Sequence, residues 1–426
     1  MHLCGIDIGT TSICAVVIDQ KTGRLIKHRT VNSEAFIDSS RPFEKIQDPR
    51  KIISLAKALL DEVLTDEIVS IGVSGQMHGI VYLDAQGEAV SPLYTWQDKR
   101  GDEPYLDSTY ASYLGSYAGY GNVSDFYNRE NGIRPREAVT YATVHDYLVM
   151  KLCGKKTPLL HVTNAASLGL FDEKTLTFRY DYAPEITADD TVAGYYRGIP
   201  VSVAIGDNQA SVLSTLTDDD ALLLNFGTGS QISLVSDRPI TAENIESRPY
   251  FDHQYLLVGS ALCGGRAYSL LCDFYHALLS EHTPLSRDAV YLIMERMLCE
   301  GSEQVLCVDT RFAGTRAHSD QTGSITGITT ENFTPAALTR GVLVGMVEEL
   351  YGMYLEMGCV RTHAVASGNG IRKNPHLKKI AGERFAMPVK MPEHLEEAAY
   401  GAALFGAIAA GYFCSIKEAQ SLIRFQ

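Results

Sequence analysis

Two short turns rich in glycine and threonine have the residue types needed to bind phosphate. In the first, Gly9-Thr10-Thr11 follows Asp7 and lies between two apolar runs. Glycine lets consecutive backbone N–H groups approach an anion closely without a lysine, and the Asp7 carboxylate could hold Mg²⁺, directly or through water. An ordinary β-hairpin with a surface aspartate and a hydroxyl-rich turn is the alternative interpretation.

The second turn has the same construction. Gly227-Thr228-Gly229 separates an apolar run at 221–226 from another at 231–235, so strand, turn and strand recur in the second half of the chain. Two such hairpins, each at the head of a domain, can face each other across a cleft and hold the two ends of a triphosphate. The internal repeat therefore favours the phosphate-binding interpretation of both turns.

A third group of side chains suits a polyol. Gln76, Met77 and His78 follow a predicted buried strand, the position at which open α/β sheets bind ligands. An amide and an imidazole can bond hydroxyl groups, while a thioether can lie against the carbon face of a sugar. Trp96, the only tryptophan, and Asp98 add an apolar face and a charged acceptor. The alternatives are a structural histidine, a tryptophan in the core and an aspartate that caps a helix.

Asp207 is the candidate catalytic base. It stands in Gly206-Asp207-Asn208, where a predicted strand at 201–205 passes into a helix. A carboxylate at this junction can accept a proton from a substrate hydroxyl, and capping the helix is the competing role. Asn164, in an expected loop, could support the site or simply form a turn.

A glycine-rich stretch late in the chain is a candidate nucleoside site. Ser367-Gly368-Asn369-Gly370 follows a predicted strand and precedes Asn374. Bare backbone of this kind lets an adenine ring lie close to the chain.

Hydrophobic periodicity and turn residues predict the elements that position these groups. The predicted strands are 3–8, 13–18, 24–31, 68–73, 201–205, 221–226 and 231–235. The predicted helices are 49–64 with Asp48 as its cap, 139–152, 335–357 and 396–410, the last rich in alanine and glycine. Residues 163–167 are expected to form a loop, and residues 101–132 have no clear pattern and could form a lid or a partner surface.

Composition limits the class of protein. A chain of 426 residues with 45% hydrophobic and 21% charged residues can form two or three globular domains. The formal charge of −14 argues against nucleic acid or an anionic membrane surface as a partner. The nine cysteines form no C-x-x-C pair, which favours reduced thiols in a cytoplasmic protein. The sequence also lacks the pattern of a secretory signal or a membrane span.

The motifs stand in the order found in the FGGY family of carbohydrate kinases, which the chain resembles over nearly its whole length. They are Asp7-x-Gly9-Thr10-Thr11, Ser74-Gly75-Gln76-Met77-His78-Gly79, Trp96-Gln97-Asp98, Gly206-Asp207-Asn208-Gln209-Ala210, Gly227-Thr228-Gly229 and Ser367-Gly368-Asn369-Gly370. The resemblance implies two actin-like (ribonuclease H-like) α/β domains around a cleft for ATP and sugar. Residues 1–197 would bind the sugar and carry the first phosphate loop, and residues 198–426 would carry the catalytic aspartate, the second phosphate loop and the adenosine site.

The resemblance also implies residue roles. Asp207 would accept the proton of the attacking hydroxyl, and Asp7 would serve Mg²⁺. The sugar contacts would be Gln76, Met77, His78, Trp96, Asp98 and Asn208. The ATP contacts would be Thr10, Thr11, Gly227, Thr228, Gly265, Gly368, Gly370 and Asn374. The expected ligands are a small-molecule sugar, ATP and Mg²⁺, with no nucleic acid or membrane partner and with a homodimer as an allowed assembly.

The implied reaction transfers phosphate from ATP to a ketose hydroxyl. Sedoheptulose, giving its 7-phosphate, is the expected acceptor, and xylulose and ribulose are the alternatives. Cys14 departs from the family pattern, which has Lys or Arg there, so a cation near the phosphates is missing or supplied elsewhere. This departure motivates an alternative of another class, a catalytically weak actin-like sugar sensor.

Overall fold

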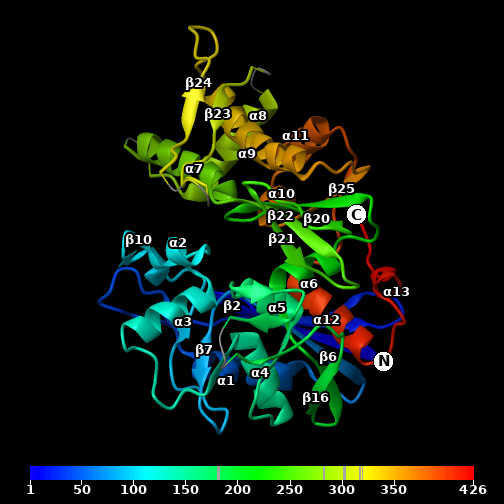
Figure 1. Cartoon of the computed structure of the whole chain (residues 1–426). Helices are drawn as coiled ribbons and strands as arrows, with labels where there is room; N and C mark the ends of the chain where they lie inside the picture. The colour runs from blue at the N-terminus through cyan, green and yellow to red at the C-terminus, as the bar shows by residue number, and fades with distance from the viewer. Residues whose placement is uncertain (180–182, 282–283, 301–303, 316–317, 319) are drawn as a thin grey trace. The chain divides into compact units, whose positions relative to one another are not determined.

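The computed structural model describes residues 1–179, 183–281, 284–300, 304–315, 318 and 320–426, and only the backbone of residue 300. These residues form two compact units (Figure 1). Unit 1 comprises Met1–Thr217, Arg248–His253 and Glu396–Arg424, and unit 2 comprises Asp218–Ser247, Gln254–Leu395 and Phe425–Gln426. Both units are discontinuous in sequence, whereas the predicted division into residues 1–197 and 198–426 is a single cut.

Unit 1 is built on a mixed sheet. Seven of the described strands form it: β1 (His2–Ile8), β2 (Ser12–Asp19), β3 (Leu25–Asn32), β6 (Ile68–Gly75), β16 (Val192–Tyr196), β17 (Ile199–Ser202) and β18 (Ile205–Gly206). Their order is β16-β17-β6-β1-β2-β3, and β18 also pairs with β6. The first three strands, each predicted from the sequence, form an antiparallel meander, while β6 runs parallel to β1 and β18 runs parallel to β6.

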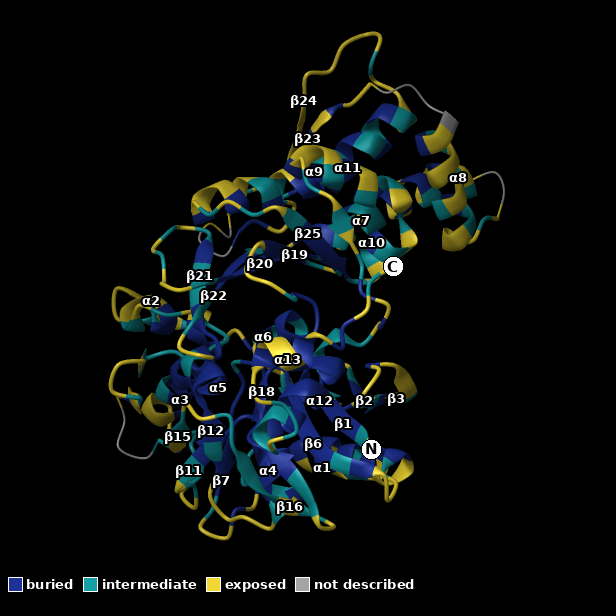
Figure 2. Ribbon diagram, turned by 90° about the vertical axis from the view of Figure 1, so that its right-hand side faces the viewer, coloured by how far each residue is buried: buried dark blue, intermediate teal, exposed yellow. Residues whose placement is uncertain are grey.

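Helices pack on this sheet through small or apolar side chains. The backbone of α12 (Glu397–Ala409) packs directly on the backbone of β1 and β6. A Cβ added to Gly5 would lie 1.9 Å from Ala399 O, and one added to Gly72 would lie 1.7 Å from Ala402 O. The predicted alanine- and glycine-rich helix is confirmed, and Figure 2 shows it in the dark blue of buried residues.

The helix predicted after Asp48 is also confirmed. It is α1 (Pro49–Val63), and the Asp48 carboxylate accepts the N–H groups of Arg50 and Lys51. Its apolar residues join those of β1, β2 and β6 in one hydrophobic cluster.

The helix predicted at 139–152 starts later than expected. The first residues of the predicted range form a strand instead, β11 (Thr140–Ala142), which pairs with β7 (Val81–Leu83). Thr143 then caps α4 (Val144–Cys153) by accepting a backbone N–H. A short apolar run fits either structure, and pairing with β7 decided for the strand.

Residues 101–132 are organised by contacts between aromatic rings. They contain most of η1 (Arg100–Asp102) and all of β9 (Pro104–Tyr105), β10 (Ser108–Thr109), α2 (Tyr110–Leu114) and α3 (Gly121–Glu130). The ring centroids of Tyr105, Tyr110 and Phe126 lie 4.4 to 6.0 Å apart. These contacts explain why the segment has structure without a helical or strand periodicity.

The remaining elements of unit 1 are short. They are β4 (Phe36–Ile37), β5 (Ile46–Gln47), β8 (Leu93–Tyr94), β12 (Leu159–His161), α5 (Val162–Ser167), β13 (Phe171–Asp172), β14 (Thr177–Phe178), β15 (Glu185–Thr187), α6 (Asp207–Leu213) and α13 (Ile416–Gln420). The prediction of a loop at 163–167 was wrong, because α5 forms there with His161 as its N-terminal cap.

Unit 2 has a sheet of its own. Six of the described strands form it in the order β21 (Ile245–Pro249), β22 (Tyr255–Ala261), β20 (Ser230–Ser236), β19 (Ala221–Phe226), β25 (His363–Ser367) and β26 (Val389–Lys390). The antiparallel pair β19 and β20 is the predicted second hairpin, and β25 runs parallel to β19.

Helices of unit 2 share a hydrophobic cluster with this sheet. They are α7 (Gly264–Ser280), α8 (Arg287–Glu300), α9 (Pro335–Met357), α10 (Asn369–Lys373) and α11 (Pro375–Phe385), and a separate hairpin is formed by β23 (Cys307–Asp309) and β24 (Ser324–Thr326). The bounds of α9 are those predicted from the sequence. Within the described ranges, no helix combines the length and the apolar character that crossing a membrane requires.

Candidate active site

The catalytic candidates of unit 1 lie where three parallel strands end. Asp7 is paired with Ser74 across β1 and β6, and Ser74 is paired with Ile205 across β6 and β18. Asp207 follows β18 directly, as the first residue of α6. Because the carboxyl ends of parallel strands meet at one edge of a sheet, the two aspartates come together there. Asp207 thus belongs to unit 1, whereas the predicted division placed it in the C-terminal domain.

The Asp7 carboxyl is held at the strand edge by a hydrogen bond. Ser74 Oγ donates to Asp7 Oδ1 at 2.8 Å. Burial raises the pKa of Asp7 to about 6, the Ser74 bond lowers it, and the charge of Glu396 raises it. Asp7 therefore shares its surroundings with two more carboxyls, Glu396 and Asp207.

Asp207 has surroundings suited to a base. Burial and the charge of Asp7 raise the pKa of Asp207 to about 7, while the Arg248 guanidinium and the N–H of Asn208 lower it. Arg248 Nη1 also donates to Asn208 Oδ1 at 3.1 Å. A carboxyl that titrates near neutral pH can both take up and release a proton during turnover.

The two aspartates fit a site for Mg²⁺. This ion takes oxygen ligands and often uses one or two carboxylates together with substrate phosphates and water. Asp7 and Asp207 offer such oxygens, and a cation would relieve the repulsion that raises the pKa of Asp207. In the part of the chain that the structure describes, no group of three or more His, Cys, Asp or Glu side chains could hold a metal alone. The donor set therefore suits an ion shared with phosphate.

Thr10 belongs to a network with the predicted sugar residues. Thr10 Oγ1 donates to Gln76 Oε1 at 3.3 Å and accepts from Trp96 Nε1 at 2.9 Å. Gln47 Nε2 donates to Thr10 O at 2.6 Å, and Gln76 Nε2 donates to Gln47 Oε1 at 2.9 Å. Trp96 is 45% exposed, which is incompatible with a core tryptophan. The Thr10 hydroxyl thus holds the indole and the amide in place, and the neighbouring Thr11 is exposed on the turn.

Met77 and His78 are fixed by close contacts. Met77 is buried, and a Cβ added to Gly206 would lie 2.8 Å from its sulfur. His78 has a left-handed backbone with φ 73°, and its Nδ1 lies 2.7 Å from Ser167 O, so that nitrogen carries the proton. The His78 ring stacks on Tyr120 with 4.4 Å between centroids. The imidazole is therefore held in one orientation and one tautomer.

Asp98 does not have the surroundings of a sugar ligand. It is 1% exposed, and its oxygens accept from Arg100 Nε at 2.7 Å, Arg100 Nη2 at 3.0 Å and Lys45 N at 3.0 Å. Arg100 is itself fully buried and lies over the Tyr94 ring, 4.2 Å from its centroid. Because protein donors engage both oxygens, the geometry supports the structural alternative for Asp98 and does not support the predicted sugar contact.

Asn164 supports the strand that leads to Asp207. Asn164 Nδ2 donates to Ala204 O at 2.9 Å and to the two Asp146 oxygens at 3.2 Å each. Burial raises the pKa of Asp146 to about 8, and bonds from Thr143 and Asn164 lower it. Of the two roles considered for Asn164, the structure therefore favours support of the site.

Position 14 supplies no positive charge. Cys14 pairs with Asp7 across β1 and β2 and is buried. Burial raises the pKa of its thiol to about 12, a Thr30 bond lowers it, and the charges of Glu396 and Asp7 raise it. The thiol is therefore neutral and lies among acids.

In unit 2, the second glycine turn meets the start of a helix. Gly265 N donates to Gly227 O at 2.9 Å, and Arg266 N donates to Thr228 O at 3.0 Å. A Cβ added to Gly264 would lie 2.0 Å from an atom of Ser230, so only glycine lets α7 start this close to the turn. Because these two N–H groups of α7 are used by the turn carbonyls, it is the amides of the turn itself that can bind an anion.

The predicted adenosine residues lie beside the same hairpin. Gly368 has φ 89°, and a Cβ added there would lie 2.6 Å from Phe226 O. A Cβ added to Gly370 would lie 2.7 Å from that oxygen. Asn374 follows α10 and caps α11 by accepting two backbone N–H groups.

A pocket of about 820 Å³ in unit 2 brings these groups together, within the size range of small-ligand sites. Five predicted ATP residues line it: Gly227, Thr228, Gly265, Gly370 and Asn374. Gly368 lies beside the lining, and Thr10 and Thr11 belong to unit 1.

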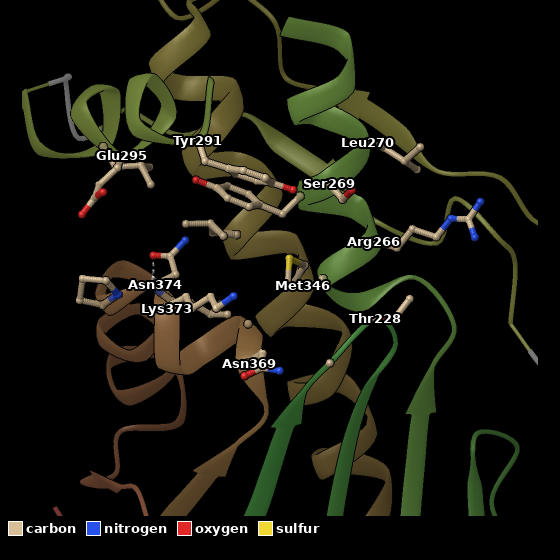
Figure 3. A pocket seen from close by; sticks show the side chains of 18 of the residues that line it. Thr228, Arg266, Ser269, Leu270, Tyr291, Glu295, Met346, Asn369, Lys373 and Asn374 are labelled. Atoms are coloured by element: carbon tan, nitrogen blue, oxygen red, sulfur yellow. Dashed lines mark hydrogen bonds between the residues drawn. The ribbon is translucent and has the colours of Figure 1, made fainter. Parts of the chain in front are cut away.

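The rest of the pocket lining combines aromatic and charged groups. The Tyr268 and Tyr291 rings stack with centroids 5.9 Å apart. Figure 3 shows Lys373 and Asn374 at one side of the pocket and Arg266 at the other, beside Thr228. The pocket thus combines a stacked pair of aromatic rings with the cationic side chains of Arg266 and Lys373.

Sequence reasoning missed several residues of the site. They are Gln47, Ser74, Tyr120, Ser167, Arg248 and Glu396. Ser74 could have been found, because it ends the strand next to the one that Asp7 ends. Arg248 and Glu396 had no local signal, since only the fold brings them to the aspartates.

A carboxyl base beside hydroxyl-binding side chains in unit 1, and a phosphate turn with a nucleoside-sized pocket in unit 2, are the parts of a phosphotransferase. Residues 2–105 match the N-terminal domain and residues 222–410 the C-terminal domain of the FGGY family of carbohydrate kinases. The chain is 30% identical to sedoheptulokinase of Mus musculus and 29% identical to that of Homo sapiens, with 94% of this chain and 96% of each relative covered. The chain therefore belongs to the FGGY family of carbohydrate kinases and is a sugar phosphotransferase.

Solved structures show the same fold. A xylulose kinase from Lactobacillus acidophilus matches with a TM-score of 0.82 and 17% identity, covering 100% of this chain and 92% of that chain. Plasmodium falciparum glycerol kinase with ADP matches with a TM-score of 0.80 and 18% identity, covering 99% and 92%. These likenesses confirm the predicted two-domain actin-like α/β fold.

Proposed function

We propose that the chain transfers the γ-phosphate of ATP to the terminal hydroxyl of sedoheptulose, giving sedoheptulose 7-phosphate. The two sedoheptulokinases that match 94% of the chain support this substrate. The structural observation that carries the reaction is Asp207, whose pKa of about 7 and position beside Asp7 suit a base for a hydroxyl proton.

Asp207 accepts the proton of the attacking hydroxyl. Phosphoryl transfer passes through a loose transition state, so the protein mainly positions the reactants and neutralises charge. Arg248 lowers the pKa of Asp207 and thereby increases the ionised fraction that can act as a base. Arg248 also donates to the amide oxygen of Asn208, and Asn208 binds a sugar hydroxyl.

His78 and Trp96 hold the sugar. The exposed indole faces its C–H groups and the imidazole bonds its hydroxyls, while the buried Gln76 amide bonds Thr10, which in turn holds the indole. Because Thr10 and Gln47 fix these side chains before the sugar arrives, less conformational entropy is lost on binding.

Mg²⁺, when bound, neutralises charge on the phosphate oxygens, and Asp7 would hold it, which leaves the Asp207 carboxyl to act as the base. In unit 2, the turn at Gly227 and Thr228 binds phosphate, and the pocket lined by Gly370 and Asn374 takes the adenosine. Arg266 and Lys373 are the cationic side chains among the residues that line this pocket.

A coupled assay of ADP release over a panel of ketoses tests this function. We expect kcat/KM for sedoheptulose to exceed those for xylulose and ribulose by at least about tenfold. A higher kcat/KM for a pentulose would assign the chain as a pentulose kinase. No sugar-dependent ADP release from folded protein would favour the sugar sensor. Light scattering on the same preparation would test the predicted homodimer.

A further inference from the structure

An exposed thiol and an imidazole meet at the edge of the pocket in unit 2. Cys299, near the end of α8, is exposed, and its Sγ lies 3.4 Å from His376 Nε2. His376 is the second residue of α11. An imidazole at this distance can accept the thiol proton as the sulfur attacks a disulfide. Phosphoryl transfer makes no use of this pair.

The pair is joined to the pocket through both of its residues. Leu298, which precedes Cys299, is buried and lines the pocket. Asn374 also lines it, and Asn374 Oδ1 accepts the N–H of His376 at 3.1 Å and that of Leu377 at 3.2 Å. A group attached to Cys299 would therefore lie next to His376, whose backbone N–H is held by Asn374.

Two other cysteines provide matched controls. Cys307 and Cys414 are also exposed. Among the described residues, neither sulfur has an imidazole within hydrogen-bond distance, whereas Cys299 does. The three thiols therefore share exposure and differ in the neighbouring base.

We propose that Cys299 is a modification site that forms a mixed disulfide with a low-molecular-mass disulfide, and that this modification weakens nucleotide binding. His376 takes the thiol proton, and Cys299 Sγ attacks one sulfur of the disulfide. The new S–S bond forms as the old one breaks, so Cys299 is oxidised and the leaving thiolate is reduced. The leaving thiolate then takes the proton from His376. The effect on nucleotide binding rests on the proposed function, whereas the modification itself does not.

Treatment of the folded chain with oxidised glutathione, followed by peptide mass spectrometry, measures the modification rate of each cysteine. We expect Cys299 to react at least about tenfold faster than Cys307 and Cys414, and His376→Gln to reduce the rate at Cys299 to theirs. Equal rates at the three cysteines of the unaltered chain would overturn the proposal. An unchanged Cys299 rate in folded His376→Gln protein would overturn the role of the imidazole.

Calorimetric titration with ADP measures the consequence. The modified chain should bind ADP at least about fivefold more weakly, and dithiothreitol should restore the affinity. Cys299→Ser should bind ADP like the unaltered chain both before and after treatment. Unchanged ADP affinity of the modified chain would overturn the coupling. If the untreated chain binds no ADP, the proposed function and the coupling both fail, while the labelling result still decides the modification.

Discussion

Asp207 must be ionised before it can accept a proton, and its surroundings set the pH at which this happens. Because the carboxyl is protonated below its pKa, which is about 7 in the chain without a cation, we predict that kcat/KM for the ketose falls as the pH drops through this pKa, at a pH below 7 when Mg²⁺ lies on Asp7. Arg248→Gln removes a charge that lowers this pKa, so the falling limb should move to higher pH. Steady-state pH profiles of the two proteins measure the shift.

Arg197→Gln is the matched control for this measurement. Arg197 pairs with Asp61, its side chain is 55% exposed, and it is not among the groups that shift the pKa of Asp207. Its pH profile should coincide with that of the unaltered chain. If the acidic limb of the pH profile does not move in folded Arg248→Gln protein, the result would contradict the assignment of Asp207 as the base.

Trp96 and Asp98 should respond to substitution in opposite ways. Trp96→Ala should raise KM for the sugar by about tenfold with little effect on stability, because the indole is exposed. Asp98→Asn should lower the free energy of unfolding by about 3 kcal/mol, because it removes the nearer carboxylate of the buried Arg100 and leaves only Glu44, 3.5 Å away, to pair with that charge. Kinetics and denaturant unfolding of both variants test this. Normal stability with a raised sugar KM in Asp98→Asn would restore Asp98 as a sugar ligand.

Residue type and local position together made part of the site predictable. Asp7 and Asp207 were each predicted as site residues near the end of an apolar strand, and the structure brings them together in unit 1, although the predicted division placed them in different domains. Asp98 also follows an apolar segment, yet its carboxylate forms a salt bridge with Arg100. Sequence position could not separate these aspartates, because burial and the choice of partner depend on the whole of unit 1.

At the scale of elements, the junction after β25 depends on glycine. Gly368→Ala would strain a backbone of positive φ and would also press a Cβ against Phe226 O. Gly358 has φ 62° and open space around its Cβ position, so Gly358→Ala measures the backbone strain alone. We predict a loss of about 1 kcal/mol of unfolding free energy for Gly358→Ala and at least about 2 kcal/mol for Gly368→Ala. Gly368→Ala should also weaken ADP binding. Denaturant unfolding and calorimetry measure both effects, and equal results for the two variants would contradict this role of Gly368.

Long periodic elements could be predicted and short ones could not. The helix at 335–357 has a cap, a proline at its first position and a continuous apolar pattern, and its predicted bounds are those observed. Residues 140–142 are too few to show a period, so their strand was assigned to the following helix. In residues 101–132 the ordering contacts are between aromatic rings, which leave no simple repeat in the sequence.

At the scale of the whole molecule, the chain returns to unit 1 twice after leaving it. The segments Arg248–His253 and Glu396–Arg424 bring Arg248 to Asp207 and Glu396 to Asp7. A single cut in the sequence could not anticipate these returns, because they join residues that are far apart in the chain. The charge environment of the base is therefore a property of the assembled unit.

Phosphate transfer to sedoheptulose with Asp207 as the base is tested most directly by a single-turnover experiment with ATP and Mg²⁺. Product identity is read by phosphorus NMR after rapid quenching. The unaltered chain should form sedoheptulose 7-phosphate, and Asp207→Asn should still bind ATP and the sugar but form the product at least about 10³-fold more slowly. Near-normal transfer by Asp207→Asn, or ATP hydrolysis without a sugar phosphate by the unaltered chain, would contradict the account.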